Sequence, residues 1–141
     1  MSKETSSSKT ILAINDDPAI LNLFEDLLTD EGYHVVLDQF SRTTTDILND
    51  IRSIQPDLVI MDFIIGAEGT GWQLLQAVRM DRTTRSIPII VCTGAVRQVE
   101  ELSSHLDTMN VRVVLKPFDI DHLLEIVDLV WANADEASRS E

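Results

Sequence analysis

Short apolar runs alternate with amphipathic stretches along most of this chain, and this alternation constrains its fold more than any other feature. Five runs have the length of β-strands, at residues 11–14, 33–37, 58–61, 88–92 and 111–115. Stretches with apolar residues at helical spacing follow them, at residues 18–28, 45–54, 72–80, 96–106 and 120–131. Strands that alternate with helices in this way are typical of βα units wound into a parallel sheet.

The composition of the runs also predicts how the strands are ordered. The third and fourth runs are almost wholly apolar, as expected of central strands covered by helices on both faces. Right-handed crossovers then favour a doubly wound, five-stranded parallel sheet in the order 2-1-3-4-5 with five helices. We therefore predict one α/β domain at residues 10–132, with flexible polar tails at residues 1–9 and 133–141.

Charge and cysteine content exclude several classes of function. Eleven basic residues against 24 acidic ones give a net charge of −13, which repels nucleic acid and anionic membranes. The sequence has no apolar run of membrane-spanning length and no leader of the secretory type. The one cysteine, Cys92, cannot form an intramolecular disulfide and lies in an apolar run, so we expect a buried thiol in a cytoplasmic protein. The spacing of zinc ligands is absent.

Four of the five apolar runs end on polar residues of different chemical types. The first run stops at Asn15-Asp16-Asp17, the third at Asp62, the fourth at Thr93 and the fifth at Lys116. In a doubly wound sheet, ligands collect beyond the carboxyl ends of the strands, at the switch point between strands 1 and 3. We therefore expect carboxylates, a hydroxyl and an ammonium to meet at one edge of the sheet.

Such a set of groups suits a metal ion and a phosphoryl group. A hard cation such as Mg²⁺ prefers a few carboxylates and keeps several waters, which fits Asp16 and Asp62 on adjacent strands. The cation would shield Asp62 from an incoming phosphate, so that this carboxylate could act as a nucleophile and carry an acyl phosphate. Thr93 could donate a hydrogen bond to one phosphoryl oxygen, and Lys116 could pair with another.

Residues 10 to about 131 resemble the receiver domain of the two-component response-regulator family. The segments that carry the resemblance are ILAINDDPAI with its acidic pair, PDLVIMD ending at Asp62, PIIVCTGA with Thr93, and VLKPF with Lys116. Each segment is a weak signal by itself, but four of them in order at strand ends make a specific one. The resemblance covers nearly the whole chain except its tails.

The resemblance implies a flavodoxin-like receiver fold and a signalling function that is not that of an enzyme. A histidine kinase or a phosphotransfer protein would donate a phosphoryl group to Asp62 in the presence of Mg²⁺ or Mn²⁺, and Thr93 would then move toward the phosphate. With no output domain attached, the chain looks like a single-domain receiver whose output is the binding preference of a downstream protein. Whether a homodimer forms through the face of the fourth helix is left open.

This sequence departs from the family pattern at several positions near the expected site. Asn15 stands where the family usually has an acid, so we expect it to contribute to the metal only weakly or through a water. Val113 stands where many receivers have a rotating aromatic residue. Ile64 should offer a backbone carbonyl to the metal. Neither its side chain nor that of Ala95 can orient an attacking water, so we expect slow autodephosphorylation.

Three other readings compete with a phosphoacceptor. A pseudo-receiver would keep the fold and bind partners without phosphorylation, as Asn15 and Val113 suggest. An aspartyl phosphatase would need a second acid at position 64, where the chain has isoleucine. A flavin carrier shares the fold only by analogy. Taken alone, Asp16 could merely cap the first helix and Asp62 could be an ordinary carboxylate at a strand end.

Overall fold

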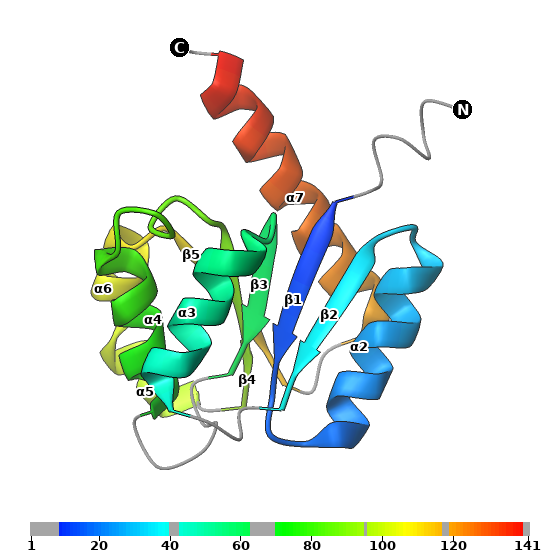
Figure 1. Cartoon of the computed structure of the whole chain (residues 1–141), viewed down its shortest axis with the longest axis horizontal. Coiled ribbons are helices and arrows are strands. Elements are labelled where there is room, and N and C mark those ends of the chain that lie inside the picture. The colour runs from blue at the N-terminus through cyan, green and yellow to red at the C-terminus, as the bar shows by residue number, and fades with distance from the viewer. Residues whose placement is uncertain (1–8, 40–42, 63–69, 95, 117–118, 140–141) are drawn as a thin grey trace.

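The five predicted strands form one parallel sheet in the predicted order β2-β1-β3-β4-β5, in a computed structural model (Figure 1). The structure describes residues 9–39, 43–62, 70–94, 96–116 and 119–139. The strands are β1 (Thr10–Ile14), β2 (His34–Asp38), β3 (Leu58–Met61), β4 (Ile89–Thr93) and β5 (Val111–Leu115). Every strand pair is parallel, which confirms the predicted topology.

Helices cover both faces of this sheet (Figure 1). They are α2 (Pro18–Asp30), α3 (Thr44–Ile54), α4 (Thr70–Met80), α5 (Val96–Glu101), α6 (Ser103–Thr108) and α7 (Ile120–Arg139). Side chains of α2 and α7 pack on one face, and those of α3, α4 and α6 pack on the other. None of these described helices is both long enough and apolar enough to cross a membrane.

Alternate residues of the strands supply two separate cores. In β1, Leu12 and Ile14 face α3 and α4, while Ile11 and Ala13 face α2 and α7. All four are at most 1% exposed. This alternation is the side-chain period of a strand, and full burial of a large aliphatic side chain stabilises the fold by about 2 kcal/mol. The two cores hold the strand ends in fixed relative positions.

Capping residues set the bounds of α2. Asp17 has extended backbone angles, and its Oδ1 accepts a hydrogen bond from the Ala19 N–H at 2.9 Å. Pro18 occupies the first turn, where its missing N–H costs nothing. After the helix, Gly32 has a φ of 95°, a left-handed conformation that glycine adopts without strain. The chain therefore reverses into β2 without a clash.

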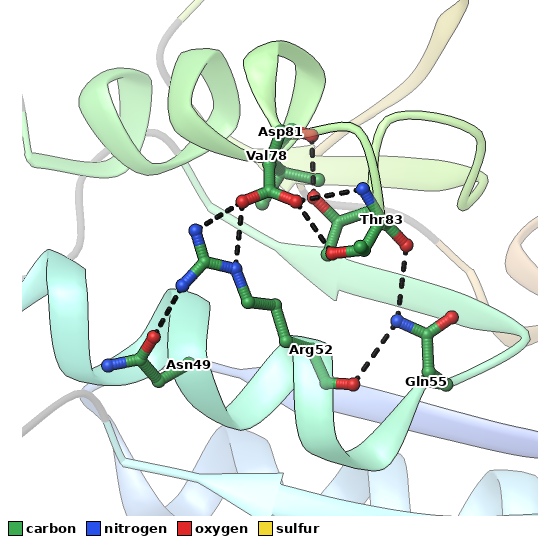
Figure 2. Close-up of polar contacts among 7 residues, drawn as sticks. Asn49, Arg52, Gln55, Val78, Asp81 and Thr83 are labelled. Atoms are coloured by element: carbon green, nitrogen blue, oxygen red, sulfur yellow. Dashed lines mark hydrogen bonds and ion pairs between the residues drawn. The ribbon is translucent and has the colours of Figure 1, made fainter.

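A polar network ties the end of α3 to the turn that follows α4 (Figure 2). Arg52 donates from Nε to Asp81 Oδ2 at 2.8 Å, forms an ion pair through Nη2, and donates from Nη1 to Asn49. The Gln55 amide donates to the backbone carbonyl of Thr83 at 3.1 Å. The hydrogen bonds from Arg52 and Thr83 lower the pKa of Asp81 to about 2. The amino-terminal edge of the sheet is thus braced by side chains.

Two elements differ from the sequence-based expectation. The predicted helix at 96–106 is divided into α5 and α6, because Leu102 leaves helical geometry with a φ of −104° and a ψ of 10°. The last helix does not end near Trp131 but continues to Arg139. Part of the segment that we expected to be a polar tail is therefore helical. Its alanine, glutamate and arginine residues are good helix formers.

Candidate functional site

The carboxyl-terminal edge of the sheet gathers the polar residues that end the apolar runs. β1 pairs with β3, and Ala13 lies opposite Ile60. Asn15 and Asp62 are the first residues beyond these two strands. Thr93 ends β4, and Lys116 comes directly after β5. The register of four neighbouring strands thus brings these side chains to one edge, as the sequence predicted.

Asp62 and Lys116 form the central contact of the site. Lys116 Nζ lies 3.0 Å from Asp62 Oδ2, and their side chains are 31% and 9% exposed respectively. The pairing compensates the burial of the carboxylate, which would otherwise be costly. The ammonium is therefore already held beside the carboxylate that is expected to react.

Thr93 joins this pair through its backbone and lies within the same edge. The Lys116 N–H donates to the Thr93 carbonyl at 2.8 Å, and the Thr93 side chain is fully buried. Thr93 also lies opposite Leu115 in the register of β4 and β5. Main-chain pairing therefore fixes the backbone positions from which the Thr93 and Lys116 side chains extend.

The three polar residues that follow β1 differ in their burial and in their hydrogen bonds. Asn15 is only 5% exposed, and its Oδ1 accepts a hydrogen bond from the Asp17 N–H at 2.9 Å. The cap of α2 is Asp17, so the alternative that Asp16 serves as this cap is wrong. Asp16 is exposed between them. Of the three polar residues, Asp16 is the carboxylate that is not used as the helix cap.

The donor set fits a hard cation that keeps much of its water. Asp16 and Asp62 follow adjacent strands, and carboxylate oxygens are preferred ligands of Mg²⁺. Among the described residues, no three histidine, cysteine, aspartate or glutamate side chains cluster as a denser metal site would require. Ile64, which we expected to offer a backbone carbonyl, lies outside the described residues, as does Ala95.

Cys92 directly precedes Thr93 in β4, but its thiol is buried and unreactive. It is buried on the face covered by α2 and α7. Burial raises the pKa of its thiol to about 12, while the nearby Lys116 ammonium opposes this shift and Asp62 adds to it. The thiol is therefore protonated at neutral pH, in agreement with the expected buried role.

Val113 lies in the strand beside Thr93, on the same face of the sheet. It pairs with Val91 and packs against the core below α4 and α6. Thr93 is two residues beyond Val91, so its side chain points to that same face. Val113 therefore lies one side-chain position before Leu115, the residue opposite Thr93, and has no polar group that could change partners.

His34 is exposed at the start of β2, His105 packs edge-on against Trp72 with ring centroids 6.4 Å apart, and His122 lies 3.9 Å from Glu125.

Asp38, the last residue of β2, was not predicted as part of this edge. Its backbone carbonyl accepts the Asn15 N–H at 3.0 Å, a contact that comes from strand pairing and that no side-chain pattern in the sequence marks.

Comparisons with known proteins point to one family. The family model described as "Response regulator receiver domain" matches residues 11–128. The regulator RpaA of Synechocystis, described as a DNA-binding dual master transcriptional regulator, is 29% identical over 127 residues, covering 89% of this chain and 50% of RpaA. This chain therefore spans about half the length of that relative. The polar-differentiation response regulator DivK of Brucella ovis is 27% identical, over 67% of this chain and 73% of DivK.

Solved structures agree in fold. A CheY-like response regulator receiver domain protein from Methanospirillum hungatei superposes with a TM-score of 0.76 at 26% identity, covering 96% of this chain and all of that one (100%). The chemotaxis response regulator CheY4 of Vibrio cholerae gives a TM-score of 0.72 at 23% identity, covering 87% of this chain and 98% of that one.

Proposed function

The chain belongs to the response regulator receiver domain family, and from this premise we propose that Asp62 accepts a phosphoryl group from a histidine kinase or a phosphotransfer protein. Receiver domains are signalling modules, so the product is a changed binding surface for a downstream protein. The observation that supports this proposal most directly is the 3.0 Å contact between Lys116 Nζ and Asp62 Oδ2 at the carboxyl-terminal edge of the sheet. We place this reaction in a cytoplasmic two-component pathway.

The transfer itself is a substitution at phosphorus. A carboxylate oxygen of Asp62 forms the new P–O bond while the P–N bond of the donor phosphohistidine breaks. The electron pair of that bond stays on the imidazole nitrogen, which ends the reaction as neutral imidazole after taking up a proton. The aspartate thereby gains a phosphoryl group that carries negative charge at neutral pH.

The residues of this chain would stabilise that charge. Lys116 can turn its ammonium from the carboxylate to a phosphoryl oxygen with little displacement, because it already lies against Asp62. The Thr93 hydroxyl, held by the main-chain link between Thr93 and Lys116, would donate to a second oxygen. Mg²⁺ or Mn²⁺ bound by Asp16 and Asp62, with Asn15 contributing weakly or through a water, would offset the repulsion between carboxylate and phosphate.

Signal output would depend on movement near Thr93 and not on an aromatic side chain. Val113 cannot alternate between a buried and an exposed hydrogen-bonding position. We propose that the Thr93 hydroxyl and the loop after β4 transmit the change. We also propose that the phosphoaspartate is long-lived, because Ile64 and Ala95 lack groups that could orient water.

The proposal is tested by incubating the protein with acetyl phosphate and Mg²⁺ and measuring its intact mass. We expect one phosphoryl adduct, which disappears in Asp62→Ala and decreases at least tenfold in rate of formation in Lys116→Ala, because a charge-assisted contact is lost. Asp107→Asn, an exposed aspartate on α6, is the matched control and should keep the adduct.

Absence of an adduct in the wild type would instead support a pseudo-receiver, a candidate that the neutral Asn15 favours. Such a protein would bind its partner equally well before and after treatment with acetyl phosphate. An adduct that persists in Asp62→Ala would show that another residue is the acceptor.

A further inference from the structure

A cavity of about 550 Å³ opens at the amino-terminal edge of the sheet, the opposite edge from Asp62. Its lining residues come from the end of α4, the segment leading into β4, the turn from α6 to β5, the start of β5, and α7. Three arginines line it, Arg79, Arg85 and Arg112, and none of the described lining residues is acidic. This volume is in the range of sites for small molecules. We call it the arginine pocket.

Arg79 is fixed in this pocket by backbone carbonyls. Its guanidinium donates to the carbonyls of Met109 at 2.8 Å, Arg85 at 2.9 Å and Ile87 at 2.7 Å, with a longer contact of 3.5 Å to Asn110. These neutral acceptors hold the group in place without cancelling its charge. Partial burial lowers the pKa of Arg79, as expected for a cation that is desolvated without a counter-ion.

Arg85, which is exposed, and Arg112, which is partly buried, are the other two arginines that line the pocket. In the described part of the chain, no ion pair joins Arg79, Arg85 or Arg112 to a carboxylate. Arg52, by contrast, is paired with Asp81 on the same side of the molecule. In a chain with a net charge of −13, carboxylates are abundant, so a cavity lined by three arginines without one is unusual.

We propose that the arginine pocket binds the phosphate group of a small organic phosphate. Guanidinium forks match phosphate oxygens in pairs, and a phosphate carries close to two negative charges at neutral pH, which suits a pocket lined by three arginines. Pro88, Ile89 and Val130 supply an apolar wall for the organic part of the molecule. The site is separate from Asp62, so this proposal does not depend on phosphotransfer.

Adenosine monophosphate and inorganic phosphate are suitable probes, titrated into the isotope-labelled full chain in the presence of EDTA so that no metal occupies the opposite edge. We expect saturable shifts of the amide resonances of Ile89, Asn110 and Arg112, with little change at Asp62 and Thr93. Adenosine, which lacks the phosphate, should produce no saturable shifts. Arg85→Gln and Arg112→Gln should each weaken binding about tenfold, since each removes a charge-assisted contact.

Arg82→Gln is the matched control, because Arg82 is an exposed arginine near the pocket but not among its lining residues. It should alter affinity by less than about twofold. The side chains of Arg85 and Arg112 donate no hydrogen bond to another described residue, so their loss should leave the fold intact, as circular dichroism would show.

Three results would overturn the proposal. These are no saturable binding of either probe, shifts confined to Asp62 and Thr93, and equal weakening by Arg82→Gln, which would indicate attraction by overall charge alone. Sedimentation with phosphatidylglycerol vesicles is a further experiment that tests a lipid phosphate as the ligand. Sedimentation with vesicles in the absence of nucleotide binding would assign the pocket to a lipid headgroup and reject a soluble ligand.

Discussion

The two edges of the sheet both concentrate charged side chains, but they use them differently. At the carboxyl-terminal edge, the Lys116 ammonium contacts the carboxylate of Asp62, which is mostly buried. At the amino-terminal edge, Arg79 donates to main-chain carbonyls, and Arg52 is paired with Asp81. Charged side chains at the carboxyl-terminal edge thus pair with each other, whereas Arg79 at the amino-terminal edge satisfies backbone carbonyls of the turns before β4 and β5.

The largest expected effect comes from removing the arginine that holds the amino-terminal edge together. Arg79→Ala deprives several partly buried carbonyls of their donor and should lower the free energy of unfolding by about 3 kcal/mol. Urea denaturation followed by circular dichroism measures this loss. Molecules that remain folded should still accept a phosphoryl group, because the substitution is at the opposite edge.

For Lys116→Ala, urea denaturation should show a small loss of stability, whereas phosphorylation should be strongly reduced. Its ion pair is about one third exposed on the lysine side, so the loss of stability should be about 1 kcal/mol, while phosphorylation is strongly impaired. If Arg79→Ala and Lys116→Ala lowered the free energy of unfolding equally, the proposed difference between the two edges of the sheet would be wrong.

A smaller effect is expected on Mg²⁺ affinity when the neutral Asn15 at the carboxyl-terminal edge is replaced by an acid. Asn15→Asp keeps an oxygen that can accept the Asp17 N–H, so the local turn should persist while one negative charge is added beside Asp62. We expect Mg²⁺ to bind about tenfold more tightly. Isothermal titration calorimetry of the two proteins checks this. Unchanged affinity would show that Asn15 does not face the metal.

The smallest effect concerns the pH dependence of the contact between Arg52 and Asp81. The pKa of Asp81, about 2 in the folded protein, lies below its usual 3.8, so the contact contributes stability above about pH 4 and loses it as the pH falls toward 2. The difference in urea midpoint between wild type and Asp81→Asn should therefore shrink over that interval. A difference that stays constant down to about pH 2 would contradict the assigned cause.

Most of the fold was predictable because its signals are local. Apolar runs and helical spacing identify strands and helices, and the handedness of crossovers restricts the strand order. The division between α5 and α6 was not predictable, because the apolar spacing continues through Leu102 while the backbone angles change there. The choice of Asp17 over Asp16 as helix cap does follow a local signal, because proline favours the first helical position and Asp17 is the residue directly before Pro18.

The sequence by itself determined the α/β class and which chemical groups end the strands, since both follow from the order of residues along short segments. Only the tertiary structure decided that Lys116 lies 3.0 Å from Asp62 across 54 positions of sequence, and that Arg79 lies among carbonyls beside a cavity. The physical reason is that such contacts depend on strand register and on how helices pack over two cores. These are properties of the whole sheet, and no single segment carries them.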